Sequence, residues 1–477
     1  MELKKPAVRQ VAEAVHRGEV TARQLIEEAL ERCNTLNSSL NTFVVIAGNE
    51  ALKQADAVDA KVKNGQKLPL AGVSVAVKDD FCYSVLPTGF GSHAFKSFYS
   101  PYSAAAVEGL IAAGAVVVGK TNLDDLSLGS AAASSPAGPA VNPWAEDRVS
   151  GSAGAAAVAA GQCLLALESD SGGSLRQGAS HCGVFGLRPT TGRISRHGLN
   201  TFASSFAQVG FTALHAEDLM EAFTAIAGFD ARDASTAVCK EVPVDQKKEM
   251  EPTDVIIGCP AAIYNHLAPG YRAVVDRARE EYAAVGFKII DLELDLFPEA
   301  LLAYYIIASA EASSNHARFD GIRFGTAGDA ANLEEFYCKS RSMALGREAR
   351  RRSIFGTFLL SKGNYELYYR QALQVWSLVR QEFKEALAKC HLLLLPAVKS
   401  MPDPIAETVD FIRSYEEDFF CAPVSLTGLP SLCLPAGLVD GLPVGLQLVG
   451  RSFGDEMLTR MAGRLAQEIK LPPSGVL

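Results

Sequence analysis

The chain has 477 residues, of which 48% are hydrophobic and 21% are charged, and its formal net charge is −9. This is the composition of a globular protein with a sizeable core, and the acidic balance argues against an independent nucleic-acid surface. Its 10 cysteines contain no Cys-x-x-Cys pair, which predicts reduced core residues and no metal site.

No stretch of 18 apolar residues free of charge occurs, and residues 1–5 lack the apolar core of a signal peptide. We therefore expect a cytoplasmic protein that does not span a membrane.

The N-terminal part predicts an amphipathic helical pair over residues 6–34, with Thr21 as an N-cap, and a further helix over 48–64. Strands near 71–78 and 115–118 alternate with a helix around 104–113, and the small residues 155–161 indicate a closely packed helix. A polar segment, 240–252, is expected to connect this part to a second lobe. The elements expected in the second lobe are a strand over 254–258, a helix over 270–285 and several helices across 296–388.

The run Glu168-Ser169-Asp170-Ser171-Gly172-Gly173-Ser174-Leu175-Arg176 places a serine directly after two glycines. Most Gly-Ser segments of this kind are simple turns. In an acyl-transfer enzyme, however, the amides of Ser171, Gly172 and Gly173 could face the oxygen that becomes negative, and one such donor contributes about 3 kcal/mol to the transition state. Ser174 is thus a candidate nucleophile that requires a base.

Lysine is a stronger candidate for that base than histidine. None of the 8 histidines pairs with a carboxylate in sequence, and His181 is merely the nearest to Ser174. Lys78, in contrast, ends an apolar stretch over residues 71–77 that reads as a buried strand. Desolvation disfavours a charged ammonium, so a lysine in this position could accept a proton, although a lysine with a solvated head is the alternative.

Two other motifs favour different enzymes. Residues 114–121 match the Walker A pattern of nucleotide hydrolases, but the four intervening residues, Ala-Val-Val-Val, are typical of a strand and not of a phosphate loop. Residues 450–454 match the Gly-x-Ser-x-Gly pattern of serine hydrolases, without a second motif for an oxyanion site.

Four blocks in order resemble the amidase signature family, and the resemblance continues through residues 428–430 and 441–447, so that it covers essentially the whole chain. The four blocks are Gly72-Val73-Ser74-Val75-Ala76-Val77-Lys78-Asp79, Gly114-Ala115-Val116-Val117-Val118-Gly119-Lys120-Thr121-Asn122-Leu123-Asp124, Ser169-Asp170-Ser171-Gly172-Gly173-Ser174-Leu175-Arg176-Gln177 and Cys182-Gly183-Val184-Phe185-Gly186-Leu187-Arg188-Pro189-Thr190.

This resemblance implies an α/β fold with a large mixed β-sheet core covered by helices on both faces. The whole chain, 1–477, would be a single amidase signature domain, with a catalytic core at about 66–215 and a second lobe at about 253–477 that carries substrate-binding segments.

The same resemblance implies a triad of lysine, a serine in a cis peptide and a nucleophilic serine. In such a triad, Lys78 is the base, Ser150 relays protons and Ser174, 24 residues further on, attacks the amide. Ser171, Gly172 and Gly173 would form the oxyanion hole, with Asp170 and Arg176 bracing the loop.

One segment departs from the family pattern. Members usually carry Gly-Gly-Ser-Ser-Gly-Gly around the middle serine, whereas residues 148–154 read Arg-Val-Ser-Gly-Ser-Ala-Gly, and Gly178 stands where the family has proline. A cis bond before a residue other than proline costs roughly 3–4 kcal/mol. Three alternatives remain open: this strain is tolerated at Val149-Ser150, Ser152 has taken over the role, or the triad is impaired.

The C-terminal half resembles the A subunits of glutamyl-tRNA(Gln) and aspartyl-tRNA(Asn) amidotransferases, over residues 318–325, 333–337 and 346–361. By this resemblance Arg352, or less surely Arg351, binds the α-carboxylate of glutamine, and Asp418 binds its α-amino group. A guanidinium and a carboxylate suit these groups, although each segment alone reads as a solvated charged face.

The resemblance therefore implies a glutamine amidohydrolase that releases ammonia for transamidation of Glu-tRNA(Gln) or Asp-tRNA(Asn). Its partners would be subunits B and C, and tRNA would be reached only through the complex. No cofactor would bind this chain, since ATP and Mg would act at a partner. The alternatives are a standalone amidase acting on a small carboxamide and a catalytically weakened scaffold that binds partner subunits.

Overall fold

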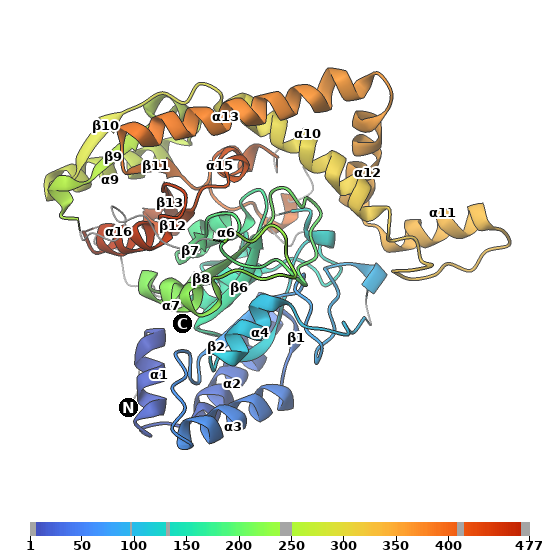
Figure 1. Cartoon of the computed structure of the whole chain (residues 1–477), viewed down its shortest axis with the longest axis horizontal. Coiled ribbons are helices and arrows are strands. Elements are labelled where there is room, and N and C mark those ends of the chain that lie inside the picture. The colour runs from blue at the N-terminus through green and yellow to red at the C-terminus, as the bar shows by residue number, and fades with distance from the viewer. Residues whose placement is uncertain (1–5, 96–97, 130–133, 239–249, 408–414, 469–477) are drawn as a thin grey trace.

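The computed structural model describes residues 6–95, 98–129, 134–238, 250–407 and 415–468. Its centre is one 11-stranded mixed sheet in the order β1-β3-β2-β6-β8-β7-β12-β13-β11-β9-β10, with helices packed around it (Figure 1). The expected α/β class with a large mixed sheet is confirmed. The strands are β1 (Phe43–Ile46), β2 (Ser74–Lys78), β3 (Val116–Thr121), β6 (Leu165–Asp170), β7 (Phe185–Arg188), β8 (Gln208–Ala213), β9 (Ile256–Cys259), β10 (Lys288–Asp291), β11 (Leu392–Pro396), β12 (Ser431–Val439) and β13 (Leu442–Val449).

The sheet has an antiparallel centre with three parallel strands on either side, and the edge strand β1 pairs antiparallel with β3. Strands β3, β2 and β6 run parallel to one another, as do β11, β9 and β10, whereas every pair from β6 through β8, β7, β12 and β13 to β11 is antiparallel. Residues from both halves of the chain therefore share one sheet. A separate two-stranded ribbon consists of β4 (Val141–Asn142) and β5 (Ala145–Val149).

The N-terminal helices form as their sequence predicts. Helix α1 spans Val8–His16, α2 spans Ala22–Leu40 and α3 spans Asn49–Lys63. The Thr21 side chain accepts a hydrogen bond from the Gln24 amide, which satisfies one of the free N–H groups at the start of α2. The predicted helical pair and its N-cap are confirmed, and the second helix extends to Leu40, beyond the predicted end at residue 34.

The central helices are α4 (Ala105–Ala112), α5 (Ala153–Ala159), α6 (Ser174–Cys182) and α7 (Ala216–Ile226). Every residue of α5 is buried, and its small side chains let it pack against β6 and α6. Helix α6 in turn contacts β6, β7, β12 and β13, so the middle of the sheet supports this helix along its length.

The C-terminal half supplies a group of helices above one end of the sheet (Figure 1). Helix α10 packs against α12, α13 and α15, while α11 extends away from the body of the molecule. These elements fulfil the prediction of helices across 296–388; the segment 240–252 lies largely outside the described residues. The helices are α9 (Pro269–Val285), α10 (Phe297–His316), α11 (Leu333–Ala344), α12 (Arg347–Leu360), α13 (Arg370–Lys389), α15 (Ala422–Thr427) and α16 (Asp455–Glu468).

A fully buried ion pair lies where the two halves of the chain meet. Asp170, the last residue of β6, accepts hydrogen bonds from Arg176 Nε at 3.0 Å and Nη2 at 3.1 Å, and Arg188 Nε lies 3.6 Å from the same carboxylate. Arg176 also donates to the Ser425 hydroxyl at 2.7 Å and to Gln447 Oε1 at 3.1 Å. The loop between β6 and α6 is therefore braced as predicted.

We expect Asp170→Asn to destabilise the protein by about 3–5 kcal/mol, because it leaves two buried guanidinium groups without a counter-charge. The free energy of unfolding in urea measures this loss. Asp56→Asn is the matched control, since the Asp56–Arg23 pair is exposed and contributes about 1 kcal/mol or less. Equal losses in the two variants would show that the buried pair is not a main stabilising contact.

Candidate functional site

The turn between β6 and α6 presents Ser174 at the first residue of a helix. Only glycine fits the two positions before it. A Cβ on Gly172 would lie 2.5 Å from the Tyr304 hydroxyl, and one on Gly173 would overlap the Cys421 side chain. Gly173 also has φ +139°, a conformation that disfavours other residues. The backbone here is consequently held close to its neighbours, as a preorganised group of N–H donors requires.

Lys78 and Ser174 meet through Ser169. Lys78 Nζ donates to Ser169 Oγ at 3.0 Å and to the Ser169 carbonyl at 3.3 Å, and the Ser174 hydroxyl donates to the same carbonyl at 3.3 Å. Lys78 lies at the end of the buried strand β2, as predicted, and its ammonium is 3.9 Å from the Asp80 carboxylate. Lys78 and Ser174 also line one small pocket.

Ser150 and Ser152, the two serines of the segment 148–154 that differs from the family pattern, have different surroundings. Ser150 is fully buried, its hydroxyl has no hydrogen-bond partner among the described residues, and it is absent from those that line the pocket. Ser152 lines that pocket together with Lys78 and Ser174. No cis peptide occurs in the described residues, so the Val149-Ser150 bond, which the sequence left open, is trans, unlike the cis serine that the resemblance implies; the Ser150 amide donates to the Ala140 carbonyl.

A buried carboxylate stands behind Ser152. Glu168 Oε2 accepts a short hydrogen bond from the Ser152 hydroxyl, and Oε1 accepts one from Thr212 at 2.8 Å. Burial raises the pKa of Glu168 to about 7, while Lys78 and these two hydrogen bonds offset part of the shift. Glu168 can therefore change its protonation state near neutral pH.

Arg352 and Asp418 belong to one cluster, joined by Tyr305. The Tyr305 hydroxyl donates a short hydrogen bond to Asp418 Oδ2, and the Arg352 guanidinium stacks on the same ring at 4.7 Å. Gln177, one turn after Ser174 on α6, donates to Asp418 Oδ1 at 2.7 Å. Burial raises the pKa of Asp418, against the effect of these hydrogen bonds and of Arg352. The structure thus connects this cluster to the helix that begins at Ser174.

Arg352 is held on one side and unpaired on the other. Its Nε donates to Glu348 at 2.6 Å, whereas the buried Nη1 has no hydrogen-bond partner in the described part of the chain. A buried donor without a partner is costly unless a ligand satisfies it. Arg351, the less favoured candidate, is 40% exposed and also pairs with Glu348.

Neither of the competing motifs forms the site that its pattern suggests. The Walker-like run contains strand β3, and Lys120 is fully buried, where its ammonium lies 3.0 Å from Asp79 and donates to the Phe81 carbonyl at 2.7 Å.

His181 is also buried, and desolvation lowers its pKa to about 4. It is not among the described residues that line the pocket of Ser174.

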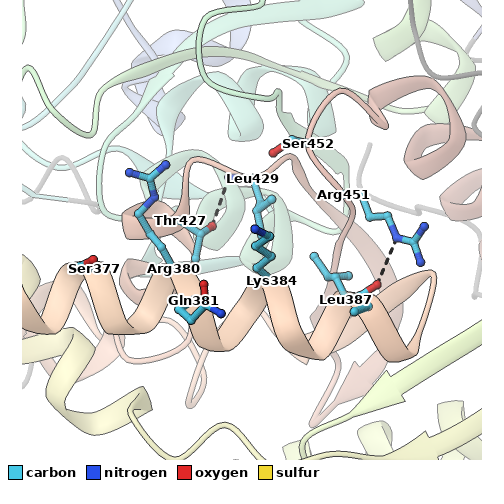
Figure 2. Close-up of a pocket in the computed structure, with 10 residues that line it drawn as sticks. Ser377, Arg380, Gln381, Lys384, Leu387, Thr427, Leu429, Arg451 and Ser452 are labelled. Atoms are coloured by element: carbon cyan, nitrogen blue, oxygen red, sulfur yellow. Dashed lines mark hydrogen bonds between the residues drawn. The ribbon is translucent and has the colours of Figure 1, made fainter.

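The serine of the Gly-x-Ser-x-Gly run, Ser452, lies at a larger pocket of about 750 Å³ beside α13 (Figure 2). Arg380, Lys384 and Arg451 give this pocket a basic lining, and Arg451 donates to the Leu387 carbonyl. Its described lining residues include no histidine or carboxylate, so they supply no base for Ser452. This larger pocket is accordingly not where the predicted chemistry lies.

Sequence patterns did not single out Ser169 as a bridge, Glu168 as a buried partner or Tyr305 as the link between Arg352 and Asp418. The signal for Glu168 was available, because a charged residue inside a six-residue strand buried on both faces must find partners.

In the part of the chain that the structure covers, no group of three potential metal ligands occurs and no helix is suited to span a membrane. Nine described cysteines are free, and eight of these are buried.

The chain is similar to known proteins over most of its length. The family model "Amidase" matches residues 24–459. The A subunit of glutamyl-tRNA(Gln) amidotransferase from Symbiobacterium thermophilum is 41% identical over 93% of both chains, and its counterpart from Nitrosococcus oceani is 40% identical over 96% of both. The crystal structure of the same subunit from Thermotoga maritima has a TM-score of 0.78 and 31% identity, and covers 94% of this chain and 92% of its own.

A crystal structure of an amidase is also similar, with a TM-score of 0.82 and 26% identity over 97% of this chain and 100% of that one. The family match spans most of the sequence, and the relatives align along nearly their full length. The chain belongs to the amidase family.

Proposed function

We propose that this chain is a glutamine amidohydrolase subunit, which releases ammonia for a transamidation carried out with partner subunits. The observation that carries the proposal is the arrangement around α6. Ser174 begins this helix next to Lys78, and Gln177 on the same helix contacts the cluster of Arg352 and Asp418. One helix thus joins a candidate nucleophile to candidate groups for an amino acid.

In the proposed reaction, the Ser174 hydroxyl attacks the side-chain carboxamide carbon of glutamine. The negative charge that develops on oxygen is stabilised by the amides of Ser171, Gly172 and Gly173. The C–N bond then breaks, ammonia leaves with the proton that Ser174 gave up, and water hydrolyses the glutamyl ester. The family resemblance assigns the base to Lys78 and the relay to Ser150.

Arg352 and Asp418 suit the α-carboxylate and α-ammonium of glutamine. The unpaired Nη1 of Arg352 offers a buried cationic donor, and a carboxylate that gains it as partner satisfies both groups. Asp418 offers the opposite charge on the other side of Tyr305. This pair of charges favours an amino acid over a simple carboxamide as the substrate.

The names of the relatives, A subunits of glutamyl-tRNA(Gln) amidotransferase, support a role in the amidation of Glu-tRNA(Gln). Subunits B and C would then bind the tRNA, and ATP and Mg would act at a partner, since the net charge of −9 gives this chain little attraction for RNA. A standalone amidase would instead hydrolyse simple amides rapidly without partners. An inactive scaffold would release no ammonia at all.

Ser174→Ala should reduce ammonia release from glutamine by about 10⁴-fold or more, because it removes the atom that forms the acyl ester. Ammonia is measured in the complex with its partner subunits and for the lone chain. Ser38→Ala, an exposed serine on α2, is the control. Unchanged ammonia release in Ser174→Ala would rule out the proposed nucleophile.

Gly173→Ala should reduce kcat by about 10²-fold, since the added Cβ would push the turn away from Cys421 and displace Ser174. Gly65→Ala is a matched control: its φ of +82° is also positive, but no atom of the described residues lies within 4 Å of the added Cβ. Comparing kcat in the two variants separates crowding from backbone conformation. Similar kcat values would show that close packing at Gly173 does not position the nucleophile.

Arg352→Lys should raise KM for glutamine about 10-fold or more, because lysine keeps the charge and loses the forked donor geometry. Hydrolysis of butyramide, which has no α-carboxylate or α-amine, should change little. Arg350→Lys on the exposed face of α12 serves as the control. Equal effects on both substrates would mean that Arg352 acts on the structure and not on the α-carboxylate.

A further inference from the structure

We propose that the pocket beside α13 binds a small molecule that carries two or more phosphate groups. This pocket, called the α13 pocket below, is the cavity of about 750 Å³ that Arg380, Lys384, Arg451 and Ser452 line (Figure 2). None of its described lining residues lines the pocket of Ser174. The inference goes beyond the proposed amide hydrolysis and does not rest on it.

Three cationic side chains from two segments line the α13 pocket. Arg380 and Lys384 lie four residues apart on α13, which places their Cβ atoms about 5–6 Å from each other on one face of the helix. Arg451 comes from the turn after β13 and lies beside Leu387 (Figure 2). Segments far apart in the sequence thus bring positive charge to one cavity.

Arg380 and Lys384 have no counter-charge in the described part of the chain, where neither side chain forms an ion pair or a hydrogen bond. The two acidic residues nearest to them on α13 are bonded elsewhere. Glu385 accepts from Gln381 Nε2 at 2.6 Å, and Glu382 accepts from two backbone amides just before α10. Like charges four residues apart on a helix repel, and an anion bound between them would relieve this repulsion.

The carboxylate nearest in sequence to Ser452 is also bonded elsewhere. Asp455 is fully buried and accepts hydrogen bonds from the amide and the hydroxyl of Thr190 at 2.7 and 2.8 Å. It lies 3.6 Å from Arg193. Neither Thr190 nor Arg193 is among the described lining residues, so the charge of Asp455 is compensated outside the α13 pocket.

Arg451 is oriented by the end of α13. Its Nε donates to the Leu387 carbonyl at 3.1 Å, and its Nη2 donates to the Cys390 carbonyl at 3.2 Å. These carbonyls are among the last of the helix, where C=O groups lack partners within the helix and attract cations. The contacts fix the position of this guanidinium at the wall of the pocket.

Hydrogen bonds also join the walls of the α13 pocket to one another. The Gly450 amide, just before Arg451, donates to the Pro430 carbonyl at 3.0 Å and so connects the end of β13 to the residue before β12. The indole of Trp376, on α13, donates to the Leu426 carbonyl of α15. The pocket is therefore formed before any ligand enters it.

The remaining lining residues indicate which ligand fits. The hydroxyls of Ser377 and Ser452 are exposed and have no hydrogen-bond partner among the described residues, so each can donate to an anionic oxygen. Leu387, Ala388 and Leu429 supply apolar surface for the body of a ligand.

Phosphate is the anion that this lining suits. Arginine and lysine both bind phosphate oxygens, and adjacent positive charges favour a diphosphate over a single carboxylate because it carries more negative charge. The net charge of −9 gives the chain as a whole little attraction for RNA. A phosphorylated small molecule therefore fits the pocket better than a nucleic-acid strand does.

Isothermal titration calorimetry of the full chain, without added Mg²⁺, tests the proposal with two probes. Pyrophosphate carries two phosphate groups alone, and ADP carries two on a nucleoside. At least one probe should bind saturably with a Kd of about 1 mM or tighter, and binding should weaken as NaCl increases. Tighter binding of ADP would identify a nucleotide as the ligand, and equal binding would identify the phosphate groups alone.

The double variant Arg380→Gln/Lys384→Gln should weaken this binding by about 10-fold or more, because it removes two charge-assisted contacts. Lys63→Gln/Lys67→Gln is the matched control. It removes the same charge from two exposed lysines four residues apart near the end of α3, at the opposite side of the molecule from α13 (Figure 1). The control variant should bind both probes as wild type does.

Equal weakening in the two double variants would overturn the proposal, since it would mean that the anion is attracted by overall charge and not by the α13 pocket. The absence of saturable binding for both probes would overturn it too. Binding of tRNA by a chain that binds neither probe would assign this surface to RNA instead. Ammonia release in Ser174→Ala tests the proposed function separately, so that either idea can fail while the other stands.

Discussion

The buried contact between Asp170 and Arg176 is the constraint on which the rest of the site depends. It joins the last residue of β6 to the first turn of α6 and so holds the intervening turn in place. Arg176 also donates hydrogen bonds to Ser425 and Gln447 in the C-terminal half. An ion pair without solvent exposure tolerates little displacement, since either charge alone would be costly. The glycines of the turn lie between Tyr304 of α10 and Cys421, the residue before α15, and Ser174 is the first residue of α6.

The same helix organises charge on two sides of the nucleophile. On one side, Ser169 joins Lys78 to Ser174, and Glu168 lies behind Ser152 in a buried polar network. On the other, Gln177 connects α6 to Asp418. Buried polar groups of this kind are stable only when each is satisfied, which ties the positions of the reacting groups to the packing of the sheet.

Much of this could be predicted from the sequence, because contiguous segments carry the signal. A turn and a strand end make Ser174 and Lys78 candidates, the family's sequence blocks assign their roles, and the strand character of β3 already argued against a phosphate loop. The Ser152–Glu168 contact could not be predicted, since a hydroxyl and a carboxylate 16 residues apart meet only when α5 packs on β6. Likewise, Arg352 and Asp418 are brought together by Tyr305, which comes from a third element.

Acylation of Ser174 is tested most directly by stopping the reaction of the complex with glutamine in acid and locating the acyl group by mass spectrometry of its peptides. We expect a glutamyl ester on Ser174 that forms before ammonia release reaches its steady rate. An ester on Ser150, Ser152 or Ser452, or rapid ammonia release with no acylated peptide, would contradict the proposed mechanism.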